Sequence, residues 1–198
     1  VTNNAALMVN RSDAVLIGGV ISGTGTLTQA GTGTTILAGN NTYSGTTTIS
    51  AGTLQVGNGG TTGRLGTGAL ANSGVLAINR SDTVTVTSAL GGTGSLAQVG
   101  TGTTVLTGAN TYAGGTTISA GRLQVGNGGT TGTMGTGAVV NNGALTISRS
   151  NTVTVANNIS GTGSLTKAGT GTTTLTGTNT YSGTTTISAG TLQVGNGG

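Results

Sequence analysis

The chain contains no cysteine, histidine, proline, tryptophan or phenylalanine, and only two of its 198 residues are acidic. The lack of cysteine excludes disulfides, thiolate metal sites and redox motifs. Without histidine or cysteine, neither a Ser-His-Asp nor a Cys-His catalytic arrangement can be built from this chain. Because phenylalanine and tryptophan usually supply much of the buried area of a core, this core must consist of many smaller side chains.

Charge is also scarce, since charged residues make up 4% of the chain and the net charge is +4. Such low charge, together with regularly placed apolar residues, is the reverse of the composition of disordered segments. The missing proline excludes a collagen helix, and the 42 glycines and many threonines disfavour a coiled coil. The composition therefore favours strands.

The basic residues are too scattered for a nucleic-acid site, which needs clustered lysine and arginine. They are Arg11, Arg64, Arg80, Arg122, Arg149 and Lys167. The longest apolar stretch, residues 14–21, is too short to span a membrane as a helix. We therefore expect no nucleic-acid partner and no membrane span in this segment.

One long phrase recurs through nearly the whole chain. It stands at residues 23–60, returns at 92–129 and again at 161–198, and its first and third copies differ at five positions. The period of about 69 residues predicts an array of stacked units. We expect residues 1–198 to be one solenoid segment of a longer array, with repeats at 1–69, 70–138 and an incomplete 139–198.

The local pattern predicts the architecture of each unit. Dividing the period by three gives about 23 residues, which is typical of one coil of a parallel β-helix. Thr35 and Leu37 alternate with Ile36, and the middle position becomes Val105 and Thr174 in the other copies, so we expect it to face outward. The sequence thus predicts an all-β solenoid of eight to nine coils, three per repeat, with glycines at the corners.

The third phrase, GTGSLTKAGTGTTTLTGTNTYSGTTTISAGTLQVG at residues 161–195, resembles the autotransporter passenger-associated β-strand repeat. All three copies carry its glycine, leucine, asparagine and tyrosine positions. The resemblance implies a right-handed parallel β-helix on the surface of a Gram-negative cell, anchored in the outer membrane through parts outside this segment. It also implies a role in the folding and export of a passenger.

The sequence offers little evidence for a catalytic or metal-binding site. Asp13 and Asp82 are the two acids, and a spacing of three coils would put them about 14 Å apart, beyond the 5–9.5 Å of glycosidase pairs. The GNGG segments lack the carboxylates of calcium-binding repeats. We therefore expect no enzymatic activity, no metal and no cofactor.

Tyr43, Tyr112 and Tyr181 are the three aromatic residues and recur once per repeat. They could form a line along the rod that contacts glycans or another partner. The alternative, which we favour, is that each ring packs over a corner of the solenoid.

These observations predict a structural scaffold or stalk whose partners are neighbouring β-helix segments of the same protein. Two alternatives stay open. The outer face could serve as an adhesin for host or cell-surface glycans, or the rods could self-associate end to end through their open edges into a filament.

Overall fold

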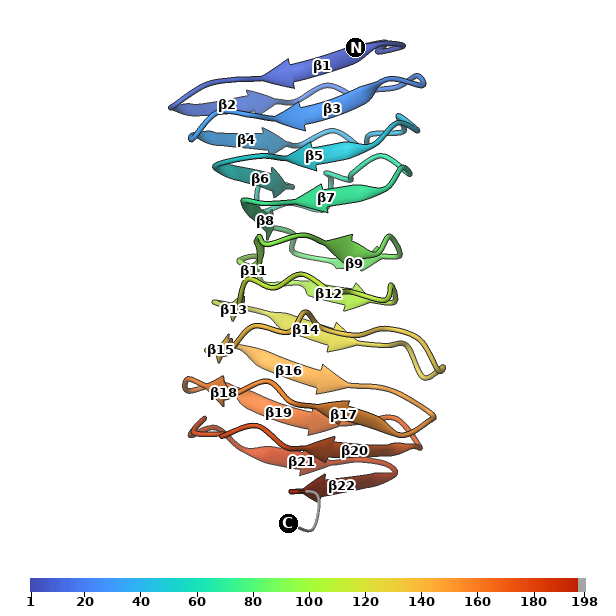
Figure 1. The fold of residues 1–198 in the computed structure, drawn as a ribbon, viewed down its shortest axis with the longest axis vertical. Coiled ribbons are helices and arrows are strands. Elements are labelled where there is room, and N and C mark those ends of the chain that lie inside the picture. The colour runs from blue at the N-terminus through green and yellow to red at the C-terminus, as the bar shows by residue number, and fades with distance from the viewer. Residues whose placement is uncertain (196–198) are drawn as a thin grey trace.

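Short runs rich in threonine, valine, isoleucine and leucine alternate with glycine turns, and the chain folds into short strands. A computed structural model describes residues 1–195, which form 22 strands stacked as about nine coils (Figure 1). Every strand pairing is parallel. The all-β solenoid predicted from the sequence is confirmed.

The strands form four sheets. A five-stranded sheet contains β1 (Ala6–Val9), β3 (Thr26–Gln29), β5 (Thr47–Ile49), β7 (Leu70–Asn72) and β10 (Leu90–Gly91). An eight-stranded sheet contains β2 (Ala14–Ile17), β4 (Thr34–Leu37), β6 (Thr53–Val56), β8 (Val75–Ile78), β11 (Ser95–Gln98), β13 (Thr116–Ile118), β15 (Val139–Asn141) and β18 (Ile159–Ser160).

A six-stranded sheet contains β9 (Thr83–Val86), β12 (Thr103–Leu106), β14 (Arg122–Val125), β16 (Ala144–Ile147), β19 (Ser164–Lys167) and β21 (Thr185–Ile187). A three-stranded sheet contains β17 (Val153–Val155), β20 (Thr172–Leu175) and β22 (Thr191–Val194).

These sheets line three faces of the rod. Face A begins with the five-stranded sheet, continues through residues 111–113 and 133–136, and ends with the three-stranded sheet. Face B is the eight-stranded sheet. Face C begins with the bridges Thr2↔Ser22 and Asn40↔Arg64 and continues with the six-stranded sheet. Each coil therefore contributes one side to each face.

Most coils are shorter than the sequence predicts. Successive stacked partners on face B are Thr35, Leu54, Leu76, Leu96, Thr116, Val139 and Ile159. Three coils thus run only from Thr35 to Leu96, although the equivalent of Thr35 in the next repeat is Thr104. The predicted coil length is too long, because most corners contain fewer residues than it requires.

Each sequence repeat therefore covers three coils and one further side. Leu27, Leu96 and Leu165 are equivalent in the three repeats, yet they lie on faces A, B and C respectively. Each repeat is turned by one face relative to the one before it. Asp13 and Asp82, one repeat apart, consequently precede strands of different faces, β2 on face B and β9 on face C.

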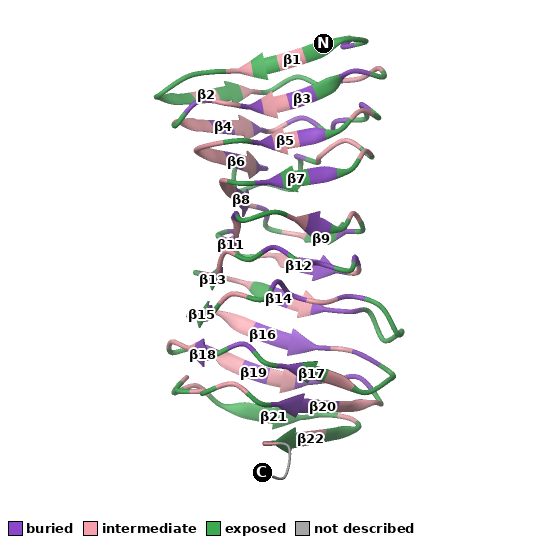
Figure 2. Cartoon of the chain, in the orientation of Figure 1, coloured by how far each residue is buried: buried purple, intermediate pink, exposed green. Residues whose placement is uncertain are grey.

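The core is a continuous column of apolar side chains inside the coils. Leu54, Leu76 and Leu96 stack directly on one another and are at most 1% exposed. Figure 2 shows that buried residues fill the middle of the rod, whereas the outermost strands at both ends are largely exposed. Since apolar burial is the main stabilising term, each inner coil depends on the two coils that cover it.

Glycine is required where coils approach most closely. A Cβ at Gly31 would lie 2.1 Å from the carbonyl oxygen of Arg11 on the neighbouring coil. Gly23 adopts a φ of 103°, which L side chains rarely adopt. Corner asparagines add bonds between coils. The side chain of Asn41 accepts from the amide of Ile21 on one neighbouring coil and donates to the carbonyl of Arg64 on the other.

Candidate functional site

Each of the two carboxylates forms an ion pair with a neighbouring arginine. Asp13 accepts two hydrogen bonds from Arg11, at 2.7 and 2.6 Å, and Asp82 accepts two from Arg80, at 2.9 and 2.7 Å. The hydrogen bonds from the arginines lower the pKa of both carboxyl groups. Neither acid is therefore placed or protonated as a general acid would be near neutral pH.

The predicted line of tyrosines is mostly inside the rod. Tyr43 and Tyr112 are 0% and 1% exposed, and their hydroxyls lie 2.6 and 2.7 Å from Thr47 and Thr116. Burial raises the pKa of both phenols. Tyr181 is only partly buried, and its hydroxyl lies 2.7 Å from Thr185. A partner cannot reach Tyr43 or Tyr112, so their burial supports the corner-packing alternative over a contact line.

Arginine side chains anchor the GNGGTTG loops at 57–63 and 126–132. Arg80 and Arg149 are each 6% exposed, and they donate to the carbonyl oxygens of Gly63 and Gly132 on the loop of the preceding coil. Arg149 also donates to the carbonyl of Thr130, and burial lowers the pKa of its guanidinium. Arg11 pairs with Asp13, and its side chain is 56% exposed.

A polar cluster lies inside the solenoid at one corner of each repeat. Gln29 donates to the carbonyls of Gly31 and Gly33, and it accepts a 2.5 Å hydrogen bond from Thr35. Gln98 makes the same contacts in the second repeat. The third repeat has Lys167 at this position, 0% exposed, donating to the carbonyls of Gly169 and Ala189.

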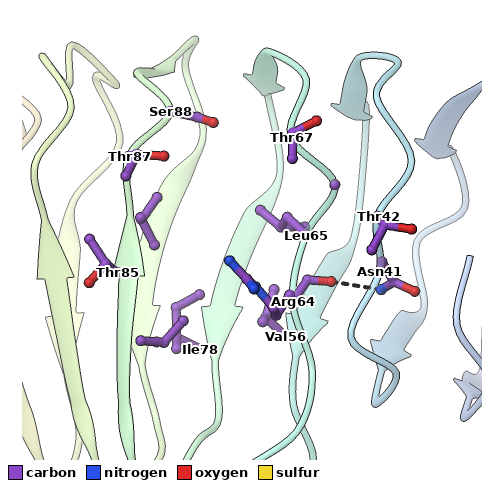
Figure 3. A pocket seen from close by; sticks show the side chains of 13 residues that line it. Asn41, Thr42, Val56, Arg64, Leu65, Thr67, Ile78, Thr85, Thr87 and Ser88 are labelled. Carbon is purple, nitrogen blue, oxygen red and sulfur yellow. Dashed lines mark hydrogen bonds between the residues drawn. The ribbon is translucent and has the colours of Figure 1, made fainter. Parts of the chain in front are cut away.

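Two equivalent clefts, here called the first and second slots, open between neighbouring coils. The first slot lies between residues 64–67 and 84–88 and has a volume of about 200 Å³. The second lies between 133–136 and 153–157 and has a volume of about 380 Å³. In Figure 3, Leu65 and Thr67 lie on one side of the first slot, and Thr85, Thr87 and Ser88 lie on the other.

The slots were not foreseen from the sequence, and their lining offers little for catalysis. Valines and isoleucines at their base are rimmed by threonine and serine hydroxyls, and no acid lines either slot. Within residues 1–195, no cluster of three acidic or metal-binding side chains occurs. The same part of the chain has no helix long and apolar enough to cross a membrane.

Comparison with known proteins gives one family. Residues 27–56, 96–125 and 165–194 each match the passenger-associated-transport-repeat family. No curated protein and no solved structure matches the chain. Each matched segment runs from the strand that carries the inner glutamine or lysine to the strand that precedes the GNGG sequence. The chain thus contains three repeats that match the passenger-associated-transport-repeat family.

Proposed function

We propose that the chain is a structural scaffold or stalk segment of an autotransporter-like passenger, secreted or displayed outside the cell, without enzymatic activity of its own. One observation carries this proposal: all three repeats share one apolar core that runs from Ile21 to Leu175. A continuous core of this kind gives a rod with length and stiffness. The ion-paired aspartates and the buried tyrosines support the proposal that the chain has no enzymatic activity.

Coil-by-coil stacking also fits the export of a passenger. Each coil contacts chiefly its neighbours, so stability is the sum of coil and interface contributions. The last folded coil presents unpaired backbone groups along its edge, and these form a template for the next coil. A chain that emerges gradually can therefore fold progressively and does not need long-range contacts to form first.

This proposal is tested by placing the chain between a signal sequence and an outer-membrane translocator barrel and measuring surface display on intact cells. Gly102→Val is the disruptive variant, because a Cβ there would lie 2.1 Å from the carbonyl oxygen of Asp82. Thr101→Val, at the exposed neighbouring position, is the control. Display should fall severalfold for Gly102→Val only. Equal display of both variants would contradict a role for coil stacking.

A further inference from the structure

The two slots are breaks in the backbone ladder. β9 and β17 each have further coils on both sides along the rod, yet each is the outermost strand of its sheet. Within residues 1–195, no backbone hydrogen bond joins 64–68 to 83–88, and none joins 133–137 to 152–157. Each slot is therefore a place where two neighbouring coils are unpaired on one face.

The same coils stay paired on the other two faces. Around the first slot, Val56 pairs with Ile78 on face B and Leu70 pairs with Leu90 on face A. The corresponding pairs around the second slot are Val125 with Ile147 and Val139 with Ile159. Two paired faces and one open face make a wedge. It can widen on the open face and expose the amides there that have no backbone partner, while the ladders of the other two faces stay intact.

Side chains bridge the two slots to different extents. In the second slot, the amide of Asn157 donates to the carbonyls of Gly135 and Gly137, at 2.8 and 2.7 Å, on the opposite coil. Ser88 is the equivalent of Asn157 in the first slot. Its hydroxyl makes one long contact of 3.4 Å with Gly68. The first slot is therefore held by fewer and longer hydrogen bonds.

We propose that the first slot is a hinge of the rod, and that the second slot is the same hinge latched by Asn157. When the rod bends, the wedge between residues 64–67 and 84–88 opens or closes. The backbone pairing on face A and face B stays intact and acts as the axis of the bend. Since the second slot lies on face A and the first on face C, the two hinges bend the rod in different directions. The hinge goes beyond the scaffold function and does not depend on export.

The test is amide hydrogen exchange of the whole purified chain, read by mass spectrometry of peptides that cover 83–88 and 153–157. Local opening governs exchange, and the one additional bond and the shorter distances at Asn157 are worth on the order of tenfold in protection. We expect exchange at 83–88 to be on the order of tenfold faster than at 153–157.

Two reciprocal variants make the test specific. Ser88→Asn should slow exchange at 83–88 to the level of 153–157, and Asn157→Ser should accelerate exchange at 153–157 by on the order of tenfold. Ser73→Asn is the matched control, because Asn4 and Asn142 are native at its equivalent positions, and it should change neither peptide.

Equal exchange at the two slots in the wild type would overturn the proposal, as would a failure of Ser88→Asn to protect 83–88. If Asn157→Ser lowers protection throughout the rod, the variant has destabilised the whole fold. The result for Ser88→Asn then decides whether the hinge proposal holds. Negative-stain images give an independent measurement. Kinks should concentrate near the first slot and become rarer in Ser88→Asn, and a uniform distribution of bends would count against a hinge.

Discussion

Lys167 takes the place of a glutamine inside the solenoid, and Thr173 is left without a hydrogen-bond partner. In the two earlier repeats the equivalent threonines, Thr35 and Thr104, donate to Gln29 and Gln98. A lysine ammonium has no acceptor to offer, and the hydroxyl of Thr173 is buried and unpaired. The third repeat therefore has a buried hydroxyl without a hydrogen bond, and the glutamines of the first two repeats indicate the substitution that would restore this bond.

Lys167→Gln should stabilise the C-terminal coils. The change restores the hydrogen bond to Thr173 and removes a buried ammonium, and we expect a gain of about 1–2 kcal/mol in the free energy of unfolding. Denaturant unfolding measures it. Gln98→Lys is the reverse control and should destabilise the middle of the rod. A Lys167→Gln variant no more stable than the wild type would refute this reasoning.

The difference in stability between the wild type and Lys167→Gln should depend on pH. Burial lowers the pKa of Lys167 below its ordinary 10.5, so the unfolded chain binds more protons than the folded chain in the window just below 10.5. Wild-type stability therefore rises with pH through that window, relative to Lys167→Gln. Burial raises the pKa of Tyr43 and Tyr112 in both proteins, so their effect cancels. Melting temperatures should converge towards pH 10.5, and a constant difference would contradict the assignment.

Arg80→Ala should release the loop at 57–63. The guanidinium is buried, and its loss removes the bond to Gly63 and leaves Asp82 unpaired, which should cost about 1–3 kcal/mol. Limited proteolysis should then cut the loop faster. Arg11→Ala is the control, since the Arg11–Asp13 pair is exposed. Similar cleavage in both variants would show that the loop is held by something else.

Tyr112→Ala should destabilise the rod much more than Tyr181→Ala. The ring of Tyr112 is fully buried, and truncating a buried aromatic side chain costs about 3–5 kcal/mol. Tyr112→Phe removes only the contact with Thr116, which is worth about 1 kcal/mol. Thermal melts of the three variants should follow that order. A small effect of Tyr112→Ala would instead reopen a surface role for the ring.

Deleting residues 92–160 should preserve the fold. The deletion removes one whole repeat and joins Gly91 to Gly161, the equivalent of Gly92, so every coil keeps a native neighbour. Electron microscopy should show rods shorter by about 16 Å, at about 4.8 Å per coil. Deleting residues 92–126, half a repeat, is the control and should unfold the downstream coils. Equal stability of both deletions would argue against register-specific stacking.

The side-chain alternation could be predicted from the sequence better than the coil length could. Thr35 and Leu37 face inward as expected, at 1% and 0% exposure. The position between them is expected to face outward, and Val105 and Thr174 are nevertheless buried there. Val105 is paired with Thr85 and Gln124, and these stacked neighbours cover it. Alternation determines on which side of a strand a side chain lies, but not how far side chains of the neighbouring coils bury it.

The length of a coil depends on its corners, which alternation does not show. The true length can be counted only once Thr35, Leu54 and Leu76 are known to stack. The slots were hidden for the same reason. Pairing between coils, and not the pattern within one coil, decides that Ser88 and Asn157 face an unpaired segment. The stretch 61–69, with its glycines and weak alternation, was the one sequence signal near the first slot.

The turn of one face per repeat gives the rod an approximate threefold screw axis, with a rotation of about 120° and a translation of about 16 Å per repeat. A loop such as 57–63 thus returns to the same side only after three repeats. Two rods lying side by side cannot slide by one repeat and match again unless they also rotate. Lateral contacts between such rods would therefore have one register over a long stretch, and copy number would set the direction in which a distal domain points.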